Sequence, residues 1–101
     1  MVMNTEFDII RICDNIKELL LHKNLKYGDS ALSPIRIMSK SGPIEQILVR
    51  IDDKLNRLKQ GDNLLMDDED LITDIIGYFI LLKIAVERDL ASCYNEDQTT
   101  V

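Results

Sequence analysis

The sequence predicts an all-α protein, a small bundle of three main helices in a single domain. Three segments repeat apolar residues at the three- and four-residue intervals of an amphipathic helix, and stretches with Gly and Pro separate them. The only strand-like stretch, "PIRIM", is too short and isolated to build a sheet. At 101 residues the chain supports one small domain. We expect this domain at residues 1–92, followed by a polar tail at 93–101.

The first helix is expected over residues 6–24. Asn4 or Thr5 can cap it, because both side chains accept hydrogen bonds from free N–H groups of a first turn. Its apolar face comprises Ile9, Ile12, Cys13, Ile16, Leu19 and Leu20. A loop at 26–42 follows, rich in Gly, Pro and Ser. Loops of this length in small domains are usually functional or flexible.

The second helix is expected over residues 43–60, because Pro43 suits a first turn and Gly61 suits a helix end. The third is expected over residues 67–90, and it contains the largely apolar run "DLITDIIGYFILLKIAV". A helix with so few polar positions is buried on nearly all sides. In a short chain that requires a snug bundle or a neighbouring subunit, so we expect a homo-oligomer, either a dimer or a tetramer.

Composition narrows the possible partners. A net charge of −6 and a pI near 4.6 argue against a broad nucleic-acid surface or an anionic membrane surface. The apolar run 71–86 is short for a bilayer span and carries Asp74 and Lys83, so no membrane segment is expected. Cys13 and Cys93 are far apart and lack CxxC spacing, which favours reduced thiols in a cytoplasmic protein.

Asp74 is the residue that most needs an explanation, because a carboxylate inside an apolar helix must be paired, hydrogen-bonded or bound to a cation. One interpretation pairs it with Lys54 or Arg57 of the second helix, as a structural ion pair. The other makes Asp74 and Asp70, one turn apart, ligands of Mg²⁺, which prefers carboxylate oxygens, waters and phosphates. Under both interpretations Asp74 faces the second helix across a polar seam.

Paired acids on two consecutive helices resemble the all-α nucleoside triphosphate pyrophosphohydrolases of the MazG and dimeric dUTPase type. Those enzymes carry EExxE on one helix and ExxD on the next, and they bind Mg²⁺. In this chain Asp52, Asp53 and Asn56 stand at the EExxE spacing, and Leu71 and Asp74 stand at the ExxD spacing. Two of the five positions therefore lack a carboxylate.

The chain is also similar to a group of small MazG-related proteins, common in bacteriophages, that are associated with nucleotide modification. Their pattern is a YG-(D/N)-S turn, a DKxxR helix and a DxxxDxxxY helix. The matching residues are Tyr27, Gly28, Asp29 and Ser30, then Asp53, Lys54 and Arg57, then Asp70, Asp74 and Tyr78. The likeness covers residues 20–86, and its three motifs in order are more specific than any one alone.

The resemblance implies Mg²⁺-dependent hydrolysis of a nucleotide between its α- and β-phosphates. The metal ligands would be Asp52, Asp53, Asp70 and Asp74, with Asp53 and Asp74 as catalytic residues. Phosphate and nucleotide contacts would come from Lys54, Arg57, Lys26 and Tyr27. The residues at the two substituted positions, Asn56 and Leu71, motivate an alternative, a non-catalytic relative that binds or sequesters a nucleotide. A third possibility is a structural helical interaction module with internal salt bridges.

Overall fold

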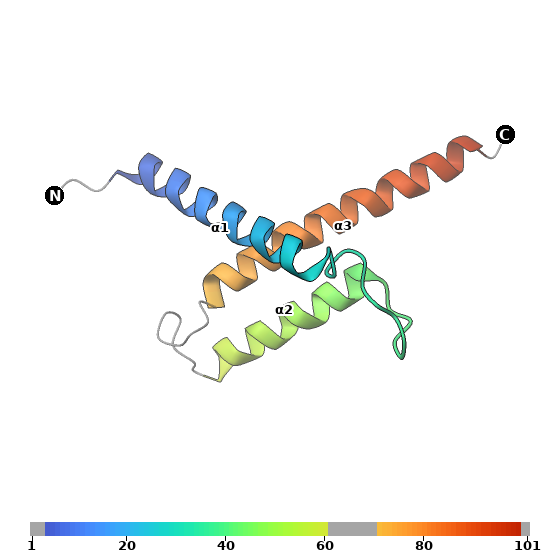
Figure 1. Cartoon of the computed structure of the whole chain (residues 1–101), viewed down its shortest axis with the longest axis horizontal. Coiled ribbons are helices and arrows are strands. Elements are labelled where there is room, and N and C mark those ends of the chain that lie inside the picture. The colour runs from blue at the N-terminus through green and yellow to red at the C-terminus, as the bar shows by residue number, and fades with distance from the viewer. Residues whose placement is uncertain (1–3, 61–70, 100–101) are drawn as a thin grey trace.

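The structure is a computed structural model that describes residues 4–60 and 71–99, with side chains described up to residue 92. Within these ranges the chain is all-helical, which confirms the predicted fold class. Helix α1 spans Thr5–Tyr27, α2 spans Pro43–Lys59 and α3 spans Leu71–Thr99. The three helices form a small bundle, and the described residues contain no strand (Figure 1).

The helix ends follow from local sequence. Asn4 caps α1, where its side-chain Oδ1 accepts a hydrogen bond from the Phe7 backbone N–H at 3.2 Å. Pro43 lies in the first turn of α2, where a missing N–H leaves no intrahelical bond unmade. Helix α1 stops at Gly28, whose left-handed φ of 63° is open to glycine without steric cost. Asp29 continues the turn with a φ of 61°, and its carbonyl accepts the Ser33 N–H at 2.9 Å.

Helix α3 is longer at its C-terminal end than expected, because it continues to Thr99 rather than stopping near residue 90. No Gly or Pro follows Gly77 in the sequence, so nothing in the chain interrupts the helix. Most of the expected polar tail at 93–101 is therefore helical. The expected start of this helix at 67–70 lies outside the described residues.

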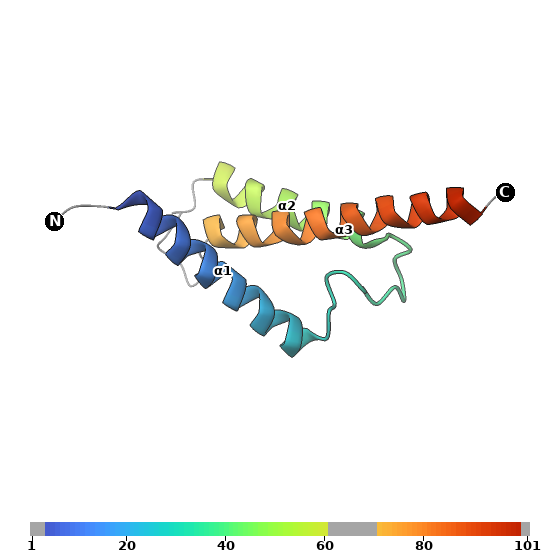
Figure 2. The ribbon, with the colours of Figure 1, turned by 90° about the horizontal axis from the view of Figure 1, so that it is seen from above.

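Helices α2 and α3 lie side by side, and α1 crosses α3 from the other side (Figures 1 and 2). Most contacts between helices join α2 to α3, whereas α1 touches α3 only around the crossing. The molecule is elongated, with extents of 63 × 33 × 26 Å. The α2–α3 pair is thus the main body of the fold.

The core forms between α2 and α3. Ile47 and Ile51 from α2 pack with Ala85 from α3, and all three are almost fully buried. The surrounding apolar side chains are Leu32, Ile44, Tyr78, Leu81 and Leu82. Ile47 and Ile51 are four residues apart, so they lie one above the other on the same face of α2.

Helix α3 is not buried on nearly all sides, contrary to the sequence-based expectation. Only the faces toward α2 and toward the α1 crossing are covered, and Ile72, Ile76 and Phe79 are exposed. The apolar face of α1 is likewise covered only in part: Ile16 is buried, but Ile9 and other members beyond the crossing are exposed. Because α1 contacts α3 only around the crossing, the single chain does not form the snug bundle.

Gly77 of α3 lies where α1 crosses α3, against Leu20 of α1. A Cβ atom added at Gly77 would lie 3.2 Å from Cδ2 of Leu20, which is tighter than ordinary van der Waals contact. Because Gly77 has no Cβ atom, Leu20 of α1 can lie close to the backbone of α3. Leu20 lies four residues after the buried Ile16, so both residues share the face of α1 that meets α3.

Replacing Ile47 with Ala should lower the free energy of unfolding by roughly 2–5 kcal/mol, because it opens a cavity in the α2–α3 core. The matched control is Val49→Ala on the same helix, where the wild-type residue is 63% exposed and the loss should stay below about 0.5 kcal/mol. Urea denaturation followed by circular dichroism measures both. Equal losses in the two variants would contradict this core.

Replacing Gly28 with Ala should destabilise the protein by about 1–2 kcal/mol, because a Cβ atom is strained at a φ of 63°. Gly28→Asn is the matched comparison, since asparagine adopts the left-handed conformation more readily. Thermal unfolding should therefore rank wild type above Gly28→Asn, and Gly28→Asn above Gly28→Ala. If the alanine variant were as stable as the wild type, α1 would not end in this conformation.

Candidate functional site

Asp74 forms an ion pair with Lys54 across the boundary between α2 and α3. The distance between Lys54 Nζ and Asp74 Oδ2 is 3.3 Å, and the two side chains are only 13% and 17% exposed. The expectation that Asp74 faces the second helix is confirmed. The pairing also agrees with the structural interpretation, which named Lys54 or Arg57 as its partner.

The position of this pair follows from helical spacing. Lys54 lies three residues after the buried Ile51, and Asp74 lies three residues after the buried Leu71. Each charged residue is thus one turn along from a core residue and shares its face. The ionic groups meet beside the apolar core, and the aliphatic stem of Lys54 can cover apolar surface while its ammonium group reaches Asp74.

Partial burial distinguishes this ion pair from the exposed pairs within α1 and within α3. The pair between Lys17 and Asp14 lies on α1 at 3.7 Å, with both side chains more than half exposed. Exposed pairs of that kind contribute little to stability because water and salt screen them. Lys54 and Asp74 have lost most of their water, so the contact between them helps to compensate both charges.

Two of the other predicted metal ligands, Asp52 and Asp53, do not form a cluster with Asp74. Asp52 and Asp53 are exposed on α2, and Asp70 lies outside the described residues. In the parts of the chain that the structure describes, no three His, Cys, Asp or Glu side chains come close enough to hold a metal ion. Among the described residues, the partner of Asp74 is therefore Lys54 rather than a group of acids.

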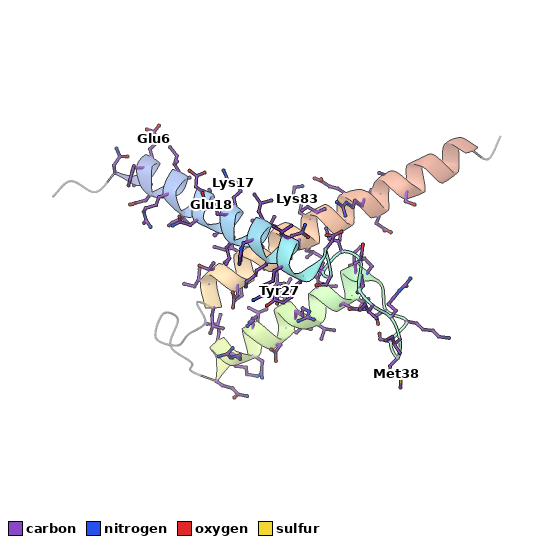
Figure 3. The ribbon with its side chains drawn as sticks, in the orientation of Figure 1. Glu6, Lys17, Glu18, Tyr27, Met38 and Lys83 are labelled. Atoms are coloured by element: carbon purple, nitrogen blue, oxygen red, sulfur yellow. The ribbon has the colours of Figure 1, made fainter. Side chains whose placement is uncertain are left out.

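The predicted phosphate-binding residues lie in two places. Arg57 is half-buried on α2, three residues after Lys54, so it extends the basic side of the α2–α3 boundary. Lys26 and Tyr27 lie in the last turn of α1, with Lys26 Nζ 5.3 Å from the centre of the Tyr27 ring, in a cation–π contact. Both are exposed, and Figure 3 labels Tyr27 at this end of α1. The tyrosine ring is thus accessible to a ligand.

A groove of about 350 Å³ lies at the other end of the α2–α3 pair. Its lining residues are Leu32, Gly42, Pro43, Ile44, Glu45, Ala85, Arg88, Asp89 and Ser92. They come from the loop, the start of α2 and the second half of α3, so no contiguous motif marks the groove. Pro43 marks a helix start in the sequence, and Arg88 is a charged residue later in the chain. The sequence does not show that they line one groove, because only the tertiary structure brings them together.

Breaking the Lys54–Asp74 pair on one side should be costly. Lys54→Met should destabilise the protein by about 1–3 kcal/mol, because it leaves a largely buried carboxylate uncompensated. The double variant Lys54→Met with Asp74→Leu should recover most of that loss, since two apolar groups replace two charges. Urea denaturation of both variants measures the difference.

Lys17→Met is the matched control, since it removes an exposed pair and should change the free energy of unfolding by less than about 0.5 kcal/mol. A Lys54→Met variant as stable as this control would mean that the charges at the α2–α3 boundary are not coupled.

No helix in residues 4–60 and 71–99 combines the length and the apolar character needed to cross a bilayer. Comparisons of the chain with protein-family models, with curated proteins and with solved structures gave no match. The candidate site is accordingly defined by this chain's own residues, the Lys54–Asp74 pair with Arg57 beside it.

Proposed function

We propose that the protein binds a nucleotide or a nucleotide-derived molecule beside the α2–α3 boundary, as a non-catalytic relative of MazG-like pyrophosphohydrolases. The observation that supports this proposal is the Lys54–Asp74 contact at 3.3 Å. It brings Lys54 of the DKxxR motif on α2 beside Asp74 of the DxxxDxxxY motif, in one polar seam. The location we propose for the protein is the cytoplasm, in keeping with its two cysteines without CxxC spacing.

The basic residues of this seam would bind the phosphate groups of the nucleotide. Arginine presents a planar fork of donors that matches phosphate oxygens, which makes Arg57 the principal candidate. Lys54 would help to fix the local arrangement while it compensates Asp74. Tyr27 offers an exposed ring for a base to stack on, with Lys26 beside it.

Binding without turnover is better supported than Mg²⁺-dependent hydrolysis. Hydrolysis between the α- and β-phosphates needs carboxylates that are free to hold metal ions and to position a water. Asp74 is engaged by Lys54, and Asp52 and Asp53 are exposed on α2 instead of converging on it. Asn56 and Leu71 supply no carboxylate at the remaining two positions.

A helical interaction module is the second candidate function. The large apolar side chains exposed on α1 and α3 favour it, because a face of this kind is typical of a surface that meets another protein. Under this alternative the Lys54–Asp74 pair is purely structural. We also propose that the bundle is completed by oligomerisation.

The nucleotide proposal predicts that a ligand will raise the melting temperature. A panel of ribo- and deoxyribonucleotides is added to the purified protein with Mg²⁺, and thermal unfolding is recorded together with pyrophosphate release. We expect stabilisation by at least one nucleotide and no release. Arg57→Gln should weaken that nucleotide's affinity roughly tenfold or more, the effect of losing one charge-assisted hydrogen bond.

Lys17→Gln is the matched control for charge, because Lys17 is exposed on α1 and distant in sequence from the seam. Unchanged affinity in Arg57→Gln would contradict the assigned contact. Pyrophosphate release that disappears in Asp53→Asn, but persists in Asp14→Asn, would instead identify a pyrophosphohydrolase. If no nucleotide stabilises the protein or is hydrolysed, the result would support the helical interaction module instead.

A further inference from the structure

A line of apolar side chains runs along the exposed side of α3. We call it the α3 stripe, and its members are Ile72, Ile76, Phe79, Lys83, Val86 and Leu90. Five of the six are apolar, and each of these five is exposed, with Phe79 at 51%. Successive members are separated by four and three residues in turn, which is the spacing of the a and d positions of a coiled coil. The spacing indicates a helix that packs against another helix.

The α3 stripe is separate from the faces that the chain itself covers. Ala85, Leu81 and Leu82 point toward α2, and Gly77 meets α1. Figure 3 labels Lys83, the polar member of the stripe, on the side of α3 opposite α2. Neither the core nor the Lys54–Asp74 pair therefore uses these residues.

The surface area of the chain indicates how much it leaves uncovered. The whole chain exposes 8,411 Å², whereas a compact monomer of 11.6 kDa exposes about 5,800 Å². The surplus of roughly 2,600 Å², to which exposed side chains of α1 and the loop also contribute, exceeds the ~1,000 Å² that each partner contributes to a typical homodimer interface. The radius of gyration is 16.9 Å, compared with about 13 Å for a compact domain of this length. It therefore also indicates a chain that leaves much of its surface uncovered.

We propose that a second copy of this chain covers the α3 stripe, and that the two α3 helices pack antiparallel. This inference does not depend on nucleotide binding. A parallel pair would set each member of the stripe against its own copy, so Lys83 would meet Lys83 of the partner subunit. Like charges facing each other across an interface are strongly disfavoured.

An antiparallel pair removes this repulsion. With the two-fold axis halfway between positions 79 and 83, Phe79 faces Lys83 of the partner subunit. A lysine ammonium over an aromatic ring is attractive, so Lys83, which pairs with the exposed Glu87 of its own helix at 3.1 Å, gains an additional contact across the interface. The contact occurs twice, once on each side of the axis, because the interface of a two-fold dimer is self-complementary.

The same axis aligns the rest of the stripe. Ile76 faces Val86 of the partner subunit, and Ile72 faces Leu90 of the partner subunit. Each pair joins an a position to a d position, as antiparallel helices require. The stripe therefore forms a continuous apolar contact on both sides of the central Phe79–Lys83 pairs, and its polar residue fixes the register.

The first test is the mass of the protein in solution. Sedimentation equilibrium at micromolar concentration should give twice 11.6 kDa for the wild type. Phe79→Lys should halve that mass, because it sets two lysines against each other on each side of the axis, while circular dichroism still shows a folded helical chain. Val49→Lys is the matched control, because it places the same charge on an exposed apolar site of α2 and should leave the dimer intact.

A monomeric wild-type protein, or an assembly that Phe79→Lys leaves unchanged, would overturn the proposal. A wild-type monomer that binds phosphatidylcholine vesicles through Phe79 would assign the stripe to a membrane surface instead, and would overturn it as well.

Disulfide trapping tests the orientation. In a background with Cys13→Ser and Cys93→Ser, the double variant Ile72→Cys with Leu90→Cys should form a covalent dimer on mild oxidation. Neither single variant should do so, since an antiparallel pair sets residue 72 of one copy far from residue 72 of the other. Cross-linking in either single variant would demonstrate a parallel pair and overturn the orientation.

Discussion

The close packing of α2 on α3 is the interaction on which the described structure depends. Ala85 is the small residue that lets Ile47 and Ile51 approach the axis of α3, and the apolar loop residue Leu32 packs against the same cluster. Burial of large aliphatic side chains is the main favourable term available to a domain this small. The ionic contact between Lys54 and Asp74 forms only because this packing brings the two helices together.

Much of this arrangement could be predicted from spacing alone. The apolar periodicity identified all three helices, and Asn4 and Pro43 marked two of their starts correctly. Asp74 was expected to face the second helix because an isolated carboxylate in an apolar run requires a partner, and Lys54 was one of two partners named. Local chemistry determines these features, so one sequence was sufficient to infer them.

Other features depend on contacts that periodicity does not reveal. An apolar face shows that Ile9 or Phe79 favours burial, but not whether the same chain supplies the covering surface. The acids Asp52 and Asp53 had suitable spacing for a metal site, yet their direction on α2 leaves them exposed. The groove beside Arg88 joins three segments, so only the tertiary fold brings its walls together.

Helix α1 differs from the other two helices in how it is held, because it contacts α3 around the crossing of Leu20 and Gly77. Helix α1 contacts the rest of the molecule around one point. It therefore contributes little to the stability of the α2–α3 core, and that core stabilises α1 only weakly. Its backbone amides should open to solvent in a separate, lower-energy event than those of α2 and α3, as a small cooperative unit of its own. Residues 4–27 are therefore the part of the chain best placed to change orientation while the remainder stays folded.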